Sequence, residues 1–329
     1  MFENQPISEV NILLVDYLTF TTKAWSVDAI KQEILCLDDQ DWDLLDHGFH
    51  GYKFAQVFNG VTIMYEGHPN ADGEDDMGVC VEISGQGCRA LETYGGIQWV
   101  YLFQLLMEEC NEFNITRLDL AFDDHTGILD KLRLKIDTDD HTYRSKCRTW
   151  EIRYGSKGFT IYHGSKKSQV LIRIYDKAAE RGLFDGTHWI RVEIQLRDGN
   201  AAGAIRAYLQ HQDLGKVYGG ILATYLVYLE DPGNDSNVSR WPVVDYWEEL
   251  IAGAERIHIA ATPGVDYNIF HLESFLRDTA GGGLYTWIEI FGLDSLPELL
   301  KQRRGKKLNP KHKLLLDLYK KDRSDRHAE

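Results

Sequence analysis

The sequence predicts an α+β protein, in which an antiparallel sheet carries helices on one face and polar, chemically reactive side chains on the other. Strand-like runs dominate the first 230 residues, and several of them alternate between apolar and charged residues. After residue 230 the pattern changes to helices punctuated by prolines. We therefore expect a larger α+β domain over residues 1–230 and a smaller, mainly helical region with a basic tail over residues 231–329.

The composition is that of a globular protein with room for one or two domains. The 329 residues are 43% hydrophobic and 26% charged and include only seven prolines, so the chain can bury a core. The longest mainly apolar run, residues 217–229, is too short to span a membrane. The first residues lack the pattern of a secretory signal, and the five cysteines form no CxxC pair. We expect a cytoplasmic protein with no membrane segment, disulfide framework or zinc ribbon.

Charge is distributed unevenly along this acidic chain. The net charge is −15, yet residues 131–197 contain 15 Lys and Arg against 8 Asp and Glu, and residues 301–329 contain 11 against 4. Each of these segments therefore carries a net charge of +7. Two basic segments in an acidic chain indicate a localised surface for a polyanion, although ordinary solvated faces would give the same counts.

The first half of the predicted sheet opens with a β-rich run and contains one clear hairpin. Asn59-Gly60 separates two strand-like runs, and this dipeptide is the strongest short hairpin signal. Ser26 is a suitable N-cap for the helix that follows the first strand. The expected elements are strands over 11–21 and 77–84, a hairpin over 54–65, and helices over 26–37 and 97–110.

The second half repeats this order of strand, helix, strands and helix. This order predicts an internally duplicated core. The two halves show no visible sequence similarity, so the prediction rests on the order of elements alone. The expected elements are strands over 116–123, 150–154, 159–163, 171–177 and 189–197, and helices over 128–134 and 201–210.

Three strands of the second half place charged residues on one face, because side chains alternate along a strand. The segments are RLDLAFDD, LIRIYDK and WIRVEIQLR, in which the residues between the polar ones are mainly Leu, Ile, Val or Phe. If these strands share a sheet, one face collects carboxylates, cations and a tyrosine. Its members are Arg117, Asp119, Ala121, Asp123, Arg173, Tyr175, Lys177, Arg191, Glu193, Gln195 and Arg197.

Asp119 and Glu193 are the candidate metal ligands on this face. Carboxylates from separate strands are hard oxygen ligands that suit Mg²⁺ or Mn²⁺, and these ions take further ligands from water and phosphate. Arg173, Lys177 and Arg191 could then position phosphate oxygens while the metal polarises the reacting one. A sheet face lined by cross-strand ion pairs needs the same residue types, so both interpretations stay open.

Tyr175 is the candidate nucleophile. A phenol has a pKa of about 10 and reacts poorly at neutral pH until a nearby cation or metal stabilises the phenolate. Arg173 and Lys177 flank Tyr175 at the spacing that puts all three on one face, which favours it over Tyr162, the competing tyrosine on the preceding strand.

Two glycine-containing turns near this face carry lysines. The turns GSKG and GSKKS would contact phosphates if nucleic acid lies across the sheet, and they are equally ordinary as turns. Neither matches GxxxxGK[ST], so we expect no ATP-driven motor. His125 and His163 are further candidates as ligand or base, although isolated histidines are more often structural. The candidate DNA contacts are Lys157, Lys166, Lys167, Arg191 and Arg197.

Four segments in this order resemble the replication initiation factor (Rep_trans) family. That family includes rolling-circle replication initiators of plasmids and filamentous phages and the related MobT relaxases of integrative conjugative elements. The resemblance spans roughly residues 10–230 and continues more weakly into residues 245–259, and its specificity lies in the combination of motifs. The segments are SGQGCRALE (84–92), ITRLDLAFDD (115–124), TIYHGSKKSQVLIRIYDKAAE (160–180) and WIRVEIQLR (189–197).

The resemblance implies a rolling-circle replication initiator that nicks and rejoins one DNA strand at an origin through a 5′-phosphotyrosyl intermediate. It assigns Tyr175 as the nucleophile and Asp119 and Glu193 as metal positions, with Asp123 and Asp124 in reserve. No two histidines here have the histidine-hydrophobe-histidine spacing of better-known rolling-circle enzymes. The implied partners are origin DNA, a separate host helicase and a second copy of the chain in a homodimer.

Three other functions are compatible with the same residues. A relaxase that starts conjugative transfer would use the same chemistry. A DNA-binding regulator would keep the fold without turnover. A metal-dependent nuclease that uses water would leave no covalent protein–DNA product.

Overall fold

The computed structural model describes residues 11–67, 77–108, 112–155, 158–184, 186–252, 276 and 281–301. The chain forms two compact units, Met1–Ala260 and Ala261–Glu329. The basic tail beyond Lys301 lies outside the described residues. The described part of the second unit contains α10 (Gly281–Phe291), a 3-10 turn (η5, Leu293–Ser295) and α11 (Leu296–Lys301).

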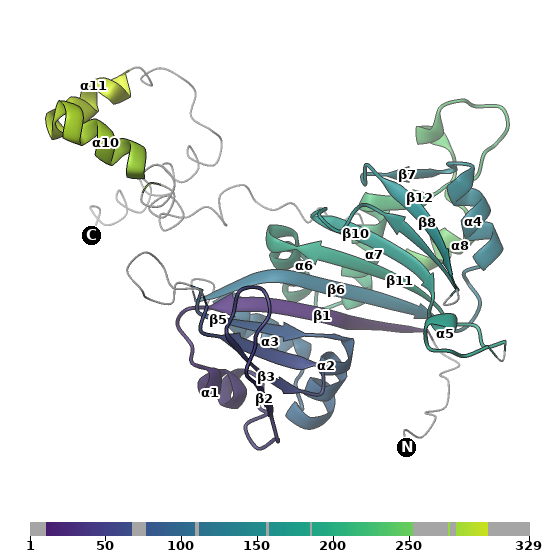
Figure 1. The fold of residues 1–329 in the computed structure, drawn as a ribbon. Coiled ribbons are helices and arrows are strands. Elements are labelled where there is room, and N and C mark those ends of the chain that lie inside the picture. Colours follow the sequence, from purple (N-terminus) through teal and green to yellow (C-terminus); the bar gives the residue numbers. More distant parts are fainter. Residues whose placement is uncertain are drawn as a thin grey trace, which may run out of the picture. The chain divides into compact units, whose positions relative to one another are not determined.

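The first unit is built on a ten-stranded sheet whose neighbouring strands are all antiparallel (Figure 1). The strand order is β2-β3-β4-β5-β1-β6-β11-β10-β9-β8, and β12 pairs with β7 in a separate small sheet. The predicted antiparallel α+β fold is therefore confirmed. The strands are β1 (Ile12–Thr22), β2 (Asp43–Leu45), β3 (Phe54–Phe58), β4 (Val61–Tyr65), β5 (Val79–Ile83), β6 (Phe113–Asp124), β7 (Tyr143–Ser145), β8 (Trp150–Gly155), β9 (Gly158–His163), β10 (Val170–Asp176), β11 (Ile190–Arg197) and β12 (Leu226–Tyr228).

The large sheet follows the same path twice. In the first half β1 is central and is followed outward by β5, β4, β3 and β2; in the second half β6 is central and is followed outward by β11, β10, β9 and β8. The two central strands pair with each other along most of their lengths. The duplicated core that was predicted from the order of elements is thus present in the topology.

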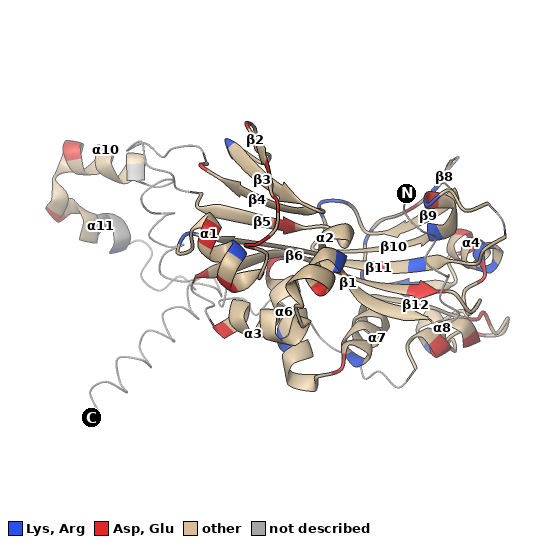
Figure 2. Cartoon of the chain, turned by 90° about the horizontal axis from the view of Figure 1, so that it is seen from below, with Lys and Arg blue, Asp and Glu red and all other residues tan. Residues whose placement is uncertain are grey.

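Helices cover one face of this sheet. The helix α2 packs on β1, β4 and β5, whereas α3 and α6 pack on β6 and on each other, and α7 packs on α6. In Figure 2 the helices α3, α6, α7 and α8 lie on one side of the sheet. The helices of this unit are α1 (Val27–Ala29), η1 (Ile30–Ile34), α2 (Gly85–Ala90), η2 (Leu91–Gly95), α3 (Trp99–Glu108), α4 (Lys131–Asp139), α5 (Lys177–Glu180), α6 (Asp198–His211), α7 (Leu214–Tyr225), η3 (Val238–Arg240) and α8 (Asp245–Leu250).

The main core lies between the sheet and these helices. It contains the apolar residues of β11, among them Val192 and Ile194, and the fully buried indole of Trp247 on α8. Because α8 packs into this core, the first unit extends beyond residue 230, where the sequence pattern changes. In the described part of the chain, no helix combines the length and the apolar character that crossing a bilayer requires.

The opposite face of the sheet differs between the two halves. In the first half a small buried cluster of Tyr52, Ala55, Met64 and Cys80 occupies it. In the second half the same face carries the charged residues of β6, β10 and β11, which are called the polar face below. The main cluster of charged side chains on this face therefore lies on the second half of the sheet.

Two short-range predictions are refined by the structure. The Asn59-Gly60 hairpin turn is present, and both residues have the positive φ angles (41° and 86°) that this turn requires. The helix expected over 128–134 instead begins after Asp130, whose side chain accepts a hydrogen bond from the N–H of Arg133. Asp130 is thus the N-cap that ends the preceding loop.

Candidate active site

The strand register brings the predicted residues of the polar face together. Glu193 lies opposite Arg173 of β10 on one side and opposite Ala121 of β6 on the other. Arg191 lies opposite Tyr175 and Asp123 in the same way. Figure 2 shows basic and acidic residues close together around β10 and β11. The alternation of residues therefore identified a contiguous surface.

Tyr175 lies near the C-terminal end of β10 on this surface and is 8% exposed. Its hydroxyl donates a hydrogen bond to Glu193 Oε2 at 3.1 Å, and the Lys177 Nζ atom lies 3.5 Å from the same hydroxyl. Burial and then the Glu193 carboxylate raise the pKa of Tyr175 above its ordinary value, although Arg191 opposes them. The phenol is therefore protonated in the free protein.

Asp119 and Glu193 form a hydrogen-bonded carboxylate pair on the polar face. Burial raises the pKa of Asp119 to about 7, and the hydrogen bond and charge of Glu193 add to this while Arg117 opposes it. Burial disfavours the charged form of Glu193 as well, but Arg173 and the hydrogen bond from Asp119 hold the pKa of Glu193 below its ordinary value. Asp119 therefore holds the proton that the two carboxylates share near neutral pH.

A divalent cation fits this pair in part. Two adjacent buried carboxylates that retain a proton mark a position where a cation would be favourable. Among the residues that the structure describes, no group of three or more His, Cys, Asp or Glu side chains is arranged to hold a metal. Asp119 and Glu193 could thus supply two ligands, with the others taken from water or phosphate.

Arg191 is held by two carboxylates. Its Nε and Nη2 atoms donate to Asp123 at 2.6 and 2.7 Å, and its Nη1 atom lies 2.8 Å from Asp16 Oδ2. The Arg191 side chain is only 6% exposed. Arg191 is therefore a fixed positive charge beside Tyr175, and a phosphate could reach it only by competing with these partners.

Asp16 is the residue that sequence reasoning missed. It lies on β1, where the register with β6 shifts between Val15 and Tyr17, so the extra residue of a β-bulge turns Asp16 toward the polar face. Asp16 is the only charged residue of β1, and that isolated charge in an apolar strand was the available signal. Alternation along β1 could not have shown it, because the bulge breaks the alternation.

Asp124, the second reserve ligand, has a structural role. Its two carboxylate oxygens accept hydrogen bonds from the backbone N–H groups of residues 126–129 and lie within hydrogen-bond reach of His188. It thereby closes the loop between β6 and α4 and points away from the polar face. Asp123 lies on the polar face, where Arg191 occupies both of its oxygens.

The alternative catalytic groups lie in different places. His163 is fully buried on the core face, where its Nε2 atom lies 3.0 Å from the hydroxyl of Tyr228. Burial lowers the pKa of His163 to about 3. His125 stacks on Trp189 at 5.1 Å between ring centroids. Tyr162 is on the polar face, opposite Arg173 and one strand away from Tyr175, so the structure leaves it available as the competing tyrosine.

The predicted DNA contacts are dispersed. Lys166 and Lys167 are exposed in the turn between β9 and β10. Arg197 is half-buried at the end of β11 on the polar face. Lys157 lies outside the described residues.

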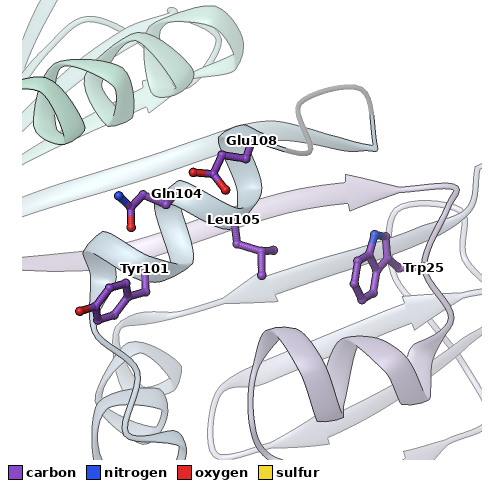
Figure 3. Close-up of a pocket in the computed structure, with 5 residues that line it drawn as sticks. All are labelled: Trp25, Tyr101, Gln104, Leu105 and Glu108. Atoms are coloured by element: carbon purple, nitrogen blue, oxygen red, sulfur yellow. The ribbon is translucent and has the colours of Figure 1, made fainter.

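A surface pocket exists elsewhere on the first unit (Figure 3). Its lining contains no cation and one carboxylate, and it lies at α3, a helix that packs on the covered side of the sheet. The pocket is thus distinct from the polar face. Its lining residues are Trp25, Tyr101, Gln104, Leu105 and Glu108.

The fold and the polar face together define a class: a duplicated antiparallel sheet with a tyrosine, a carboxylate pair and fixed cations on its uncovered side. The chain belongs to the replication initiation factor family, whose model matches residues 113–294, and the model of the rolling circle replication initiation protein N-terminal domain matches residues 12–107. The two matches correspond to the two halves of the sheet. The predicted membership in the replication initiation factor family is therefore confirmed.

Two relatives extend this assignment over most of the chain. The protein named "Putative DNA relaxase NicK" of Bacillus subtilis (strain 168) is 27% identical over 98% of this chain and 94% of its own length. The structure of a rolling circle replication initiator protein from Geobacillus stearothermophilus is 30% identical, covers 77% of this chain and 99% of its own, and has a TM-score of 0.65.

Proposed function

We propose that this protein is a metal-dependent, origin-specific endonuclease that nicks and rejoins one DNA strand to initiate rolling-circle replication. The observation that carries the proposal is the position of the Tyr175 hydroxyl between a carboxylate acceptor, Glu193, and a cation, Lys177. A nucleophile with an adjacent proton acceptor and a charge that stabilises its anion is the arrangement that nucleophilic catalysis requires.

The reaction follows from these contacts. The phenolic proton of Tyr175 leaves along its hydrogen bond to Glu193, and the phenolate oxygen attacks the scissile phosphorus. The bond from phosphorus to the 3′ oxygen breaks, the 3′ oxygen takes up a proton, and the 5′ phosphate stays bound to the tyrosine. Lys177 stabilises the phenolate, and Arg173 and Arg191 orient the phosphate. Rejoining reverses these steps without ATP, because the phosphotyrosyl bond preserves the phosphodiester energy.

Asp119 and Glu193 would hold a Mg²⁺ or Mn²⁺ ion. When bound, the ion supplies Lewis-acid polarisation of the phosphate.

Origin DNA is the proposed substrate, with a host helicase and a second copy of the chain as proposed partners. A relaxase that initiates transfer of an integrative element is the second candidate, because a relative that matches nearly the whole chain is named a putative DNA relaxase. Both functions use the same polar face. The genes that accompany the coding sequence, either transfer genes or a plasmid or phage origin, would distinguish them.

The test compares wild type, Tyr175→Phe and Tyr162→Phe on supercoiled DNA that carries the element's own origin, with Mg²⁺, Mn²⁺ or EDTA. Denaturing electrophoresis then separates nicked DNA from DNA with covalently attached protein. We expect a metal-dependent adduct from wild type and Tyr162→Phe and none from Tyr175→Phe. An adduct that persists in Tyr175→Phe would contradict the assignment of the nucleophile, and nicking without an adduct would contradict tyrosine transesterification.

A further inference from the structure

Three buried N–H donors on adjacent residues of the polar face have no hydrogen-bond partner among the residues that the structure describes. They are the Nε atom of Arg173, the Nε2 atom of Gln195 and the Nε atom of Arg197. Gln195 is only 5% exposed, so water does not readily satisfy its amide. An unpaired buried donor is costly, and native proteins rarely retain one without a reason. Here three such donors lie within two neighbouring strands.

Arg197 also differs from the other cations of this face. Arg117 pairs with Asp119, Arg173 with Glu193, Lys177 with Glu180 and Arg191 with Asp123 and Asp16. In the part of the chain that the structure describes, no carboxylate partner accompanies Arg197. The charge of Arg197 is therefore available to a ligand, whereas each of the other charges must first give up a partner.

We propose that Gln195, Arg197 and the Nε atom of Arg173 form a second phosphate-binding subsite, which holds a phosphate of single-stranded DNA other than the one that is cut. All three groups are donors and two belong to guanidinium ions, so the subsite selects an anion. This inference rests on the proposed function for its ligand. The donors themselves are present whether or not Tyr175 is the nucleophile.

The position of the subsite gives the DNA a direction. Gln195 lies four residues along β11 from Arg191, the partner of Tyr175, which corresponds to roughly 13 Å of strand. The row of Tyr175 and the proposed subsite both lie on β10 and β11. The DNA backbone therefore runs along these strands, from the tyrosine toward the C-terminal end of β11, and does not cross the sheet.

The test measures binding of a fluorescent single-stranded oligonucleotide that carries the nick site, in the Tyr175→Phe background so that no cleavage intervenes. Removal of one phosphate contact should lower the slope of log affinity against log salt by about 0.7. We expect this change for Arg197→Gln and not for Arg197→Lys. Arg206→Gln on α6 is the matched control, because Arg206 is half-buried like Arg197 but lies on a helix, and it should leave the slope unchanged.

Gln195→Leu gives an independent readout. It removes a neutral donor, so the salt slope should stay the same while affinity falls about tenfold. Because the substitution also removes an unsatisfied buried group, the melting temperature should rise. A merely structural glutamine would show the opposite pattern, with lower stability and unchanged affinity.

Methylphosphonate linkages placed one at a time along the oligonucleotide locate the subsite. One position other than the scissile phosphate should weaken binding to the parent protein and have no effect on Arg197→Gln. An unchanged salt slope in Arg197→Gln, with equal penalties at every position, would overturn the subsite while leaving the nicking proposal intact. If the parent protein does not bind the oligonucleotide at all, the subsite proposal fails, whereas adduct formation on supercoiled DNA still decides the nicking proposal.

Discussion

The buried Asp119 carboxylate makes the stability of the free protein depend on pH. Its pKa is 3.8 in an unfolded chain and about 7 in the folded protein, so the folded state keeps a proton that the unfolded state releases between these values. The contribution of Asp119 to stability therefore falls as the pH rises from 3.8 toward 7, by up to about 1.4 kcal/mol per pH unit for one proton. Asp119→Asn keeps the hydrogen-bonding shape and should flatten this dependence.

Denaturant unfolding in EDTA, between about pH 4 and pH 8, checks this prediction. The EDTA keeps divalent ions from obscuring the proton effect. Parallel pH profiles for wild type and Asp119→Asn would show that the proton resides elsewhere in the pair.

Residue alternation predicted the contents of the site and only part of its chemistry. It placed Asp119, Tyr175 and Glu193 on one face, because strict alternation leaves no other arrangement in a sheet. It could not show that Glu193 accepts the hydrogen bond of Tyr175, or that burial outweighs the flanking cations. These outcomes depend on how deeply the side chains are buried and on the pairing register between strands. The sequence of a single strand determines neither.

At the scale of elements, two glycines of the SGQGC segment lie so close to other parts of the chain that a Cβ atom at either position would clash. A Cβ atom on Gly85 would lie 2.7 Å from Asp16 Oδ1, so Gly85→Ala should displace the Asp16 carboxylate from Arg191. A Cβ atom on Gly87 would lie 2.4 Å from the backbone oxygen of Gly60, which cannot rotate away. We expect Gly85→Ala to lower nicking several-fold with little loss of stability, and Gly87→Ala to cost about 1–3 kcal/mol of stability.

Melting temperatures and nicking rates of the two variants, measured together, separate these effects. Gly155→Ala is the matched control, because no atom of the described residues lies within 4 Å of its Cβ position. Equal losses of stability in Gly85→Ala and Gly87→Ala would contradict the distinction between a movable side chain and a fixed backbone.

The sequence was most informative where elements are amphipathic. It placed β1, the β3–β4 hairpin, β6, β10 and β11 within a few residues. It did not predict α7, whose residues from Val217 to Ala223 are all buried and therefore show no periodic pattern. Short edge elements such as β2 were also missed, because three residues carry too little pattern.

At the scale of the whole molecule, the division near residue 260 predicts that residues 1–260 fold alone. That segment is compact and contains the polar face, whereas the basic segment 301–329 lies outside it. The truncated protein should keep the melting temperature of the main transition and the nicking chemistry. Its affinity for supercoiled DNA should be lower and less dependent on salt, because the basic segment 301–329 with its 11 Lys and Arg is removed.

Calorimetry and salt-dependent binding of the two proteins check this prediction. A lower melting temperature in the truncated protein would show that the second unit supports the first. An unchanged salt dependence would show that the basic tail does not contact DNA.

The central position of β1 determines how the chain can fold during synthesis. β1 is made first, pairs with β5, and cannot complete its other edge until β6 emerges about 100 residues later. At about 5–20 residues per second, that edge stays unpaired for roughly 5–20 seconds, and an unpaired edge accepts a strand from any neighbouring chain. The yield of native protein therefore depends on which strand pairs with β1 first during synthesis, the chain's own β6 or a strand of another nascent copy.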